Sequence, residues 1–271
     1  MTTLRDFENR AAPGLALASR EQLQQSLGMA NVDSDDVEFM MRTKDKIPAR
    51  YRLESRHMLD QRLFDKWFYS TSSSKLLVQW GSPLPEPADA SSSLSFLCAN
   101  LMREKPTMSS YEHLLTIRWF CGRHLEPTVN NGNELDGTRA MLMSLIVQLL
   151  RGYVGPFHME HMSSYINLHA ILTSSPDTNE LLRLFVWLVM NLPSNRTLVC
   201  IVDGVDLYEK RDPSATANMA LLALLTLTTD LRVTAKVKVL FTSAPGPFML
   251  GSLFGTNETV LLDPDMLSNP K

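Results

Sequence analysis

Residues 198–209 read LVCIVDGVDLYE, and this stretch decides the fold. Five apolar residues run without interruption into Asp203, which is followed by a glycine and then by a second acid, Asp206. A run that is apolar on both alternating faces is typical of a central strand in a parallel sheet with helices on both sides. The two acids would then stand at the carboxyl end of the strand, where α/β proteins place their ligand sites.

The segments on either side of this strand alternate between strand-like and helix-like patterns. Strands are predicted at residues 75–80, 114–121, 198–206, 236–243 and 259–262, and helices at 52–69, 94–103, 137–150, 157–172, 177–191 and 219–228. Such alternation predicts a three-layer α/β sandwich with a largely parallel, five-stranded sheet flanked by helices. Residues 1–50 are expected to form a polar, helical arm, and residues 51–271 to form the α/β domain.

The composition is typical of a globular intracellular protein. Of the 271 residues, 44% are hydrophobic and 20% are charged, which is enough for a full core. The net charge of −3 gives no bulk electrostatic reason to bind nucleic acid or an anionic membrane. Three cysteines, Cys98, Cys121 and Cys200, lie far apart in apolar segments, which favours reduced thiols over disulfides. With no signal-peptide pattern and no run that could span a membrane, we expect a cytoplasmic protein, with the nucleus as the alternative.

The segment after the first strand lacks the residues of a phosphate-binding loop. It reads GSPLPEPADASSS at residues 81–93, with three prolines and two acids. A phosphate loop needs glycines whose N–H groups converge on the anion, followed by a lysine and a hydroxyl at the start of the next helix. No lysine or arginine occurs between residues 76 and 102. The serines at 91–93 instead predict an N-cap for the following helix.

The order of these segments resembles the P-loop NTPase domain of NACHT/STAND proteins, above all the fungal forms. The resemblance covers roughly residues 60–245. It rests on FCG at 120–122, MLMSLIVQLL at 141–150, LVCIVDGVD at 198–206 and VKVLFTS at 237–243. In this family the first and second acids of the metal-binding strand match Asp203 and Asp206. The resemblance implies a P-loop NTPase fold with its site at the carboxyl edge of the sheet, and action through a protein partner or self-association.

Three departures from the family pattern affect the nucleotide site. The glycine-rich loop and its lysine are missing, Leu207 stands where the family has its catalytic glutamate, and Ala244 replaces the arginine that follows the TS pair. Without the phosphate lysine, the main source of triphosphate affinity is lost. We therefore expect a pseudoenzyme with degenerate Walker motifs, a non-catalytic scaffold or regulatory protein-interaction module that has lost nucleotide hydrolysis and needs no cofactor.

A residual nucleotide site is an alternative at the same edge. Asp203 would coordinate Mg²⁺, and Asp206, Thr242 and Ser243 would complete a site for a Mg-nucleotide. The plainer interpretation is a strand-end turn in which both acids accept hydrogen bonds from backbone N–H groups or from Arg and Lys side chains.

A further alternative is an enzyme that reuses this cleft. In the family's sheet order the second and third strands are adjacent and the first is one strand further on, so Ser82, His124 and Asp203 would share one edge. A serine nucleophile with a histidine base and an acid, with Asp206 as a further candidate, would suit acyl transfer or hydrolysis. A serine in a similar place, after the first strand, serves the tRNA-dependent cyclodipeptide synthases.

Arg123 and His124 directly follow the second strand. One interpretation is an anion site. The favoured one is a salt bridge to Asp203, Asp206 or Glu209 across neighbouring strand ends, which would stabilise a site whose ligand is lost.

Overall fold

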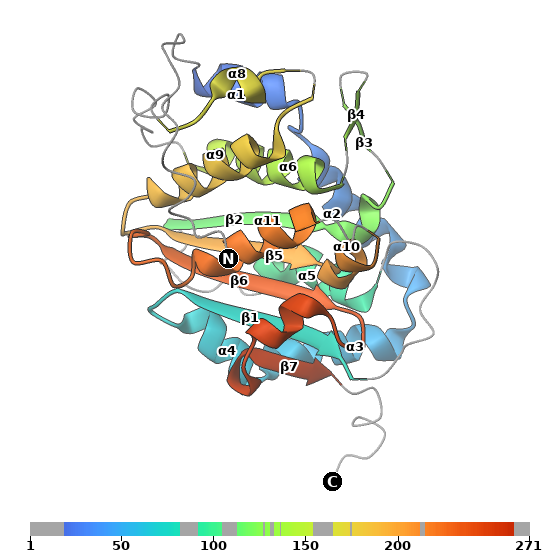
Figure 1. The fold of residues 1–271 in the computed structure, drawn as a ribbon. Coiled ribbons are helices and arrows are strands. Elements are labelled where there is room, and N and C mark those ends of the chain that lie inside the picture. Colours follow the sequence, from blue (N-terminus) through green and yellow to red (C-terminus); the bar gives the residue numbers. More distant parts are fainter. Residues whose placement is uncertain are drawn as a thin grey trace.

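A five-stranded sheet forms the centre of the computed structural model, which describes residues 19–81, 92–104, 113–126, 128–130, 133–135, 137–153, 165–173, 175–211 and 215–262. The strand order is β2-β5-β6-β1-β7, and every pair of neighbours is parallel. The strands are β1 (Ser74–Trp80), β2 (Leu114–Phe120), β5 (Thr197–Asp203), β6 (Lys236–Ser243) and β7 (Thr259–Leu262). Helices lie on both faces of the sheet (Figure 1), which confirms the three-layer α/β sandwich.

The helices divide into two sets, one for each face. One set comprises α6 (Gly137–Gly152), α9 (Thr178–Met190), α10 (Val205–Arg211) and α11 (Ala215–Thr226), and the other α3 (Ala49–His57), α4 (Arg62–Tyr69) and α5 (Ser93–Glu104). Two helices, α1 (Arg20–Leu27) and α8 (Leu168–Ile171), pack on the outside of α6 and α9. Helix α2 (Val32–Thr43) contacts α5, α6 and β2, and β3 (Thr128–Asn130) pairs with β4 (Asn133–Leu135) in a separate antiparallel hairpin.

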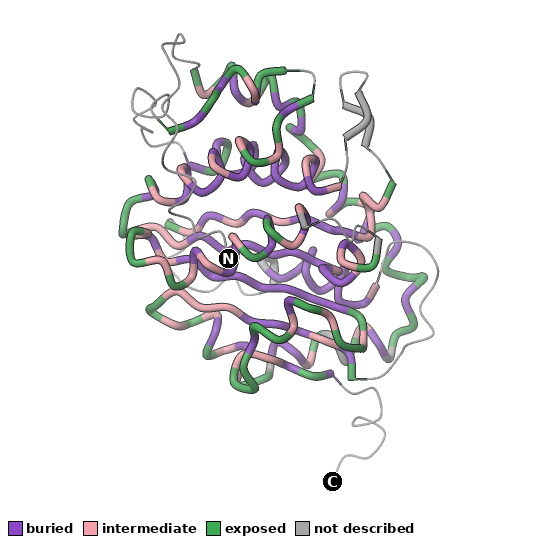
Figure 2. The backbone as a smooth tube through the Cα atoms, in the orientation of Figure 1, coloured by how far each residue is buried: buried purple, intermediate pink, exposed green. Residues whose placement is uncertain are grey.

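Alternate residues of the central strand contribute to two separate cores. Leu198, Cys200 and Val202 pack with α6, α9 and α11, whereas Val199 and Ile201 pack with α4 and α5. None of the five is more than 1% exposed, and Figure 2 shows β5 and β6 buried along nearly their whole length. Burial on both faces is the reason why this strand shows no alternation of polar and apolar residues.

The sheet order explains why the carboxyl ends of β5, β6 and β1 border the candidate site. The chain leaves β1 in the direction of β2, but it leaves β6 in the opposite direction, across β1, toward β7. In open α/β sheets such a change of direction between neighbouring strands marks the edge where ligands bind. β2 and β5 are adjacent, and β6 separates β5 from β1.

Two of the predicted elements were wrong in their bounds, for reasons that the backbone shows. The strand predicted at 198–206 ends at Asp203, because Gly204 adopts a φ of +71° and α10 begins directly after it. The single helix predicted at 52–69 is broken at Gln61, whose ψ of 131° is extended, so that α4 starts in a new direction. The helix predicted at 157–172 is tested only in part, because residues 157–164 lie outside the described residues. In the described part, only α8 (Leu168–Ile171) is helical.

A side chain from α6 covers the outer edge of β2. Gln148 accepts a hydrogen bond of 2.8 Å from the Arg118 backbone N–H through Oε1, and its Nε2 donates one of 2.8 Å to the Arg118 carbonyl. Nε2 also donates to Ser144 Oγ at 3.0 Å. An open strand edge is a template for pairing with another chain. Gln148, which is 3% exposed, satisfies this edge at the middle of the strand.

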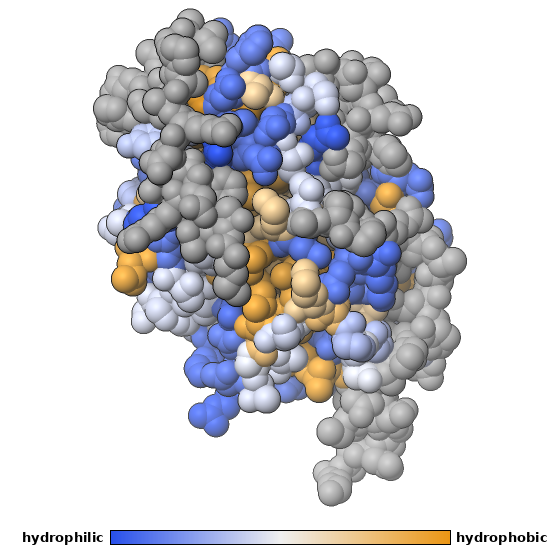
Figure 3. All heavy atoms as spheres, viewed as in Figure 1, coloured by the Kyte–Doolittle hydropathy of each residue, from blue (hydrophilic) through white to orange (hydrophobic). Residues whose placement is uncertain are grey.

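Among the helices that the structure describes, none has the length and apolar character that crossing a membrane requires. Figure 3 shows apolar atoms at the surface on the face covered by α11 and by the short 3-10 helix η6 (Met249–Leu253). Met219 and Leu222 of α11 and Met249 and Leu253 of η6 are all at least 37% exposed.

Candidate functional site at the carboxyl edge of the sheet

Asp203 ends β5 and is held by two hydroxyl groups. Its Oδ2 accepts a hydrogen bond of 2.5 Å from Ser95 Oγ, and its Oδ1 accepts one of 2.5 Å from Thr242 Oγ1 at the end of β6. Ser95 lies in the first turn of α5, where Ser92 caps the helix by accepting a hydrogen bond of 3.0 Å from the Ser95 N–H. The carboxylate, only 4% exposed, thus ties together two strands and a helix.

The turn after Asp203 requires glycine. Gly204 has a positive φ, and a Cβ at this position would also come within 3.0 Å of the Leu207 side chain. The Gly204 N–H donates to Thr242 Oγ1 at 3.0 Å, so the same hydroxyl accepts from one residue and donates to the preceding one. This sharp turn from strand to helix places the second acid, Asp206, within α10 rather than in the strand.

Asp206 is held by different partners. Its Oδ1 accepts a hydrogen bond of 3.0 Å from the Ala244 N–H, and its Oδ2 pairs with Lys210 Nζ at 2.8 Å, four residues along the same helix. The carboxylate is 3% exposed. The strand-end-turn interpretation predicts backbone N–H groups and Arg or Lys side chains as partners of both acids. Asp206 has partners of these two kinds, whereas Asp203 is bound by hydroxyls.

Burial dominates the electrostatics of Asp203. It raises the pKa of this carboxyl to about 6, although the hydrogen bonds from Ser95 and Thr242 lower it, and the nearby charge of Asp206 adds to the increase. A bound cation or a neighbouring lysine would act in the opposite direction. Among the described residues, no group of three or more His, Cys, Asp or Glu side chains could hold a metal ion.

The salt bridges predicted for Arg123 and His124 were wrong. Both residues contact Asp36 of α2: His124 Nε2 lies 2.7 Å from Oδ2, and Arg123 Nε lies 3.4 Å from Oδ1. The predicted partners bind elsewhere, since Asp203 and Asp206 have the partners given above and Glu209 accepts hydrogen bonds from the Met249 N–H. The Asp36 side chain is 3% exposed, so this contact fastens α2 to the end of β2.

An aromatic chain connects this contact to α6. The His124 ring stacks on Trp119 with centroids 4.0 Å apart and an angle of 22° between the planes. Trp119 Nε1 donates a hydrogen bond of 2.7 Å to the Tyr208 hydroxyl, which in turn donates one of 3.0 Å to the Gly137 carbonyl. His124 is therefore fixed by an acid on one side and a ring on the other, and its bonding partner is Asp36 rather than Asp203.

The remaining predicted residues are only partly placed. Ser82 and most of the proline-rich loop at 81–93 lie outside the described residues, so the serine of the predicted triad has no position here. Ser243 is 2% exposed, and its hydroxyl has no hydrogen-bond partner among the described residues. All three cysteines are buried free thiols.

Sequence reasoning missed Ser95 and Asp36. The run SSSLS offered a signal for Ser95, because the last serine lies three residues after the N-cap and so faces the end of the neighbouring strands. Asp36 gave no signal. It is one of several acids in a polar segment, and its role depends on how α2 docks.

A family model described as nephrocystin 3, N-terminal, matches residues 55–244. The chain belongs to this family. The match spans well over half of the chain, from α3 to Ala244 directly after β6. No curated protein matches the chain.

The nephrocystin 3 N-terminal match contains every residue predicted for the site, including Ser82, His124, Asp203 and Thr242. It also contains Ser95, which the structure adds. Asp36 lies before the matched range, so the acid that holds His124 and Arg123 comes from outside the family region.

Proposed function

We propose that this chain is a non-catalytic module of P-loop NTPase ancestry, of the NACHT/STAND type found in fungi, which acts as a scaffold or regulatory protein-interaction domain. The observation that carries the proposal is that protein groups bond both acids that the NACHT/STAND resemblance assigns to metal binding. Asp203 takes two hydroxyls, and Asp206 takes a backbone N–H and Lys210. Each carboxylate oxygen thus already has a donor without Mg²⁺.

The surrounding residues support loss of hydrolysis. Residues 76–102 contain no lysine or arginine for the phosphates. Leu207 packs its side chain against the hydrophobic core where the related NTPases carry a glutamate, and Ala244 offers only its backbone N–H. A polyphosphate at this edge would meet two buried acids, and the lysine that contacts them among the described residues, Lys210, is already paired with Asp206.

The enzyme alternative gains no support from the contacts of His124 and Asp203. A serine triad needs the histidine to bind both the nucleophile and the orienting acid. Here Asp203 binds Ser95 and Thr242, and His124 binds Asp36. A cytoplasmic location and action through a protein partner or self-association belong to the proposal, with the buried thiols as support for the compartment.

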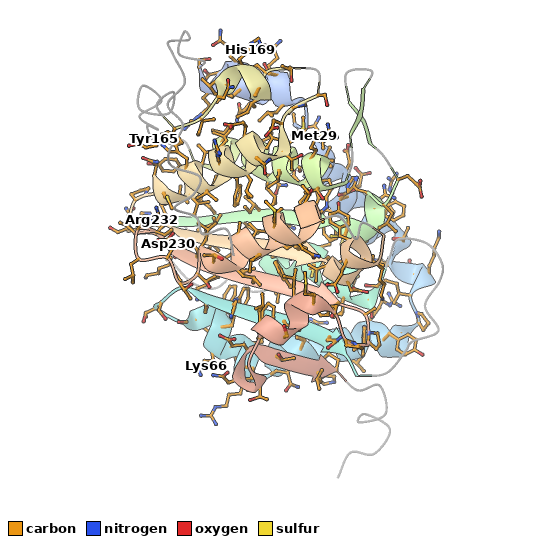
Figure 4. All side chains as sticks on the ribbon, viewed as in Figure 1. Met29, Lys66, Tyr165, His169, Asp230 and Arg232 are labelled. Atoms are coloured by element: carbon orange, nitrogen blue, oxygen red, sulfur yellow. The ribbon has the colours of Figure 1, made fainter. Side chains whose placement is uncertain are left out.

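Calorimetry with Mg-ATP, Mg-GTP and Mg-ADP tests the proposal. We expect no binding heat at micromolar nucleotide, no rise in melting temperature at millimolar nucleotide, and no release of phosphate. Asp203→Ala tests the predicted edge, and Asp230→Ala serves as the control, because Asp230 lies in the loop before β6, at the opposite edge of the sheet (Figure 4). Micromolar binding that Asp203→Ala abolishes and Asp230→Ala preserves would overturn the proposal.

A further inference from the structure

A groove on the face of the sheet that α3, α4 and α5 cover carries a concentration of positive charge. Residues of α3 and α5 line it, together with Lys44, and it has a volume of about 330 Å³. Residues 42–57 contain six Lys or Arg residues and two acids, a net charge of +4 in a chain whose total is −3. Lys44, Arg52 and Arg56 line the groove, and no acidic residue lines it among those whose side chains the structure describes. We call it the basic groove.

One face of α3 forms a wall of the basic groove. Ala49, Arg52, Leu53 and Arg56 all line it, and their spacing of i, i+3, i+4 and i+7 puts them on a single stripe of the helix. Leu53 lies between Arg52 and Arg56 on this stripe and is 55% exposed. Arg52 Nη1 lies 3.3 Å from Asp45 Oδ1, and the Asp45 side chain is 79% exposed, so this ion pair contributes little.

Helix α5 supplies the other side. Phe96, Leu97 and Asn100 line the groove from this helix, and Leu97 is 4% exposed. The groove therefore combines apolar side chains at its bottom with three cations around it. This combination matches an amphipathic helix that buries leucines at i, i+3 and i+4 and presents carboxylates on either side.

We propose that the basic groove binds an acidic amphipathic helix from a protein partner. Charge complementarity selects an acidic segment, and the apolar residues of both helices select one with a leucine-rich face. An anionic membrane fits less well, because lipid headgroups at a flat surface would contact the cations but not the apolar bottom of a groove between two helices. The inference rests on the proposed function in treating the chain as a protein-binding module.

A fluorescein-labelled, 18-residue peptide with leucine at i, i+3, i+4 and i+7 spacing and glutamate elsewhere is the probe. We expect micromolar binding by fluorescence anisotropy, and a loss of affinity of about tenfold or more in Arg52→Glu/Arg56→Glu. Leu53→Ser should also weaken binding while leaving the net charge unchanged. Melting curves confirm that each variant is folded, and Arg52→Gln/Arg56→Gln replaces the charge reversal if that variant is not.

Arg62→Glu/Lys66→Glu is the matched control. These two cations are also four residues apart and exposed, on α4, and Figure 4 shows Lys66 at the periphery of the molecule. Both double variants change the net charge by the same amount, so only a specific groove distinguishes them. Equal weakening by the two variants, equally tight binding of polyglutamate, or no peptide binding would overturn the inference.

Phosphatidylserine vesicles provide the last arm of the experiment. Vesicle binding that depends on Arg52 and Arg56, with no peptide binding, would replace the helix proposal by a membrane one. Nucleotide binding is measured on the same samples. Failure of peptide binding without nucleotide binding defeats the groove alone, whereas peptide binding together with nucleotide binding at Asp203 defeats the proposed function alone.

Discussion

The hydroxyl of Thr242 donates a 2.5 Å hydrogen bond to Oδ1 of Asp203 across the ends of two neighbouring strands. Ser95 closes the other side of the carboxylate, so protein atoms enclose both oxygens of this acid. Because this enclosure excludes water, the folded protein holds the proton of Asp203 more tightly than the unfolded chain does.

Asp203→Asn should change the pH dependence of stability. The folded pKa of about 6 lies above the reference value of 3.8, so this group contributes stability below pH 3.8 that is lost as the pH rises through about 6. The free energy of unfolding of the asparagine variant, relative to the original, should therefore improve by roughly 2–3 kcal/mol between pH 4 and pH 7. Urea denaturation at a series of pH values measures it.

Asp230→Asn is the control with the opposite sign. Hydrogen bonds from Arg232 lower the pKa of Asp230, so its contribution to stability is present above the unfolded pKa and is lost as the pH falls through the folded pKa. The relative stability of this variant should therefore worsen, not improve, as the pH rises from 3 to 6. Parallel pH curves for the two variants would contradict our account of Asp203.

Gln148→Leu should destabilise the protein by about 2–4 kcal/mol, because it removes the side chain that bonds both the half-buried N–H and the half-buried carbonyl of Arg118. Gln148→Glu should cost as much, since a carboxylate cannot donate to the carbonyl. Gln79→Leu is the comparison: Gln79 Nε2 also donates to two carbonyls, of Ala244 and Gly246, but at an exposed site where water can replace it. Equal losses of unfolding free energy for Gln148→Leu and Gln79→Leu would refute the edge-covering role.

Asp203 and Gln148 show which features of the fold and the site can be predicted from the sequence and which cannot. The sheet and its carboxyl edge were predictable, because an uninterrupted apolar run must be buried on both faces and its terminal acid must then lie at the strand end. The partners of Asp203 were not predictable, because the packing of neighbouring elements decides which group a hydroxyl or an amide side chain bonds. For the same reason the arginine and histidine after β2 were assigned to the wrong acids: the correct one, Asp36, comes from a helix whose docking no periodicity specifies.

Gly137→Ala should destabilise the protein by about 1–3 kcal/mol. A Cβ at this position would lie 2.8 Å from the Tyr208 hydroxyl and 3.0 Å from the His124 carbonyl, and the hydroxyl cannot easily move because Trp119 donates to it. At the other end of α6, a Cβ at Gly152 makes only an ordinary contact of 3.5 Å, so Gly152→Ala should be neutral or slightly stabilising.

A double-mutant cycle with Tyr208→Phe tests the cause of the Gly137→Ala effect. Removing the hydroxyl removes the shortest of the close contacts, so the double variant should be more stable than the sum of the two single effects predicts, by about 1 kcal/mol. Additive changes in the free energy of unfolding would mean that the hydroxyl is not the obstacle.

Asp36→Asn should release α2 from the end of β2. The carboxylate is 3% exposed and contacts both His124 and Arg123, so a neutral amide of the same shape loses the attraction to the guanidinium and leaves buried donors poorly satisfied. We expect a loss of about 2–4 kcal/mol in the free energy of unfolding, together with faster hydrogen exchange in Val32–Thr43 than in α6. Asp35→Asn, one residue earlier and exposed, should change stability by no more than about 0.5 kcal/mol. If Asp36→Asn unfolds α2 no more readily than Asp35→Asn does, the helix is held by its apolar contacts with α5 and α6, and the contact with His124 and Arg123 is incidental.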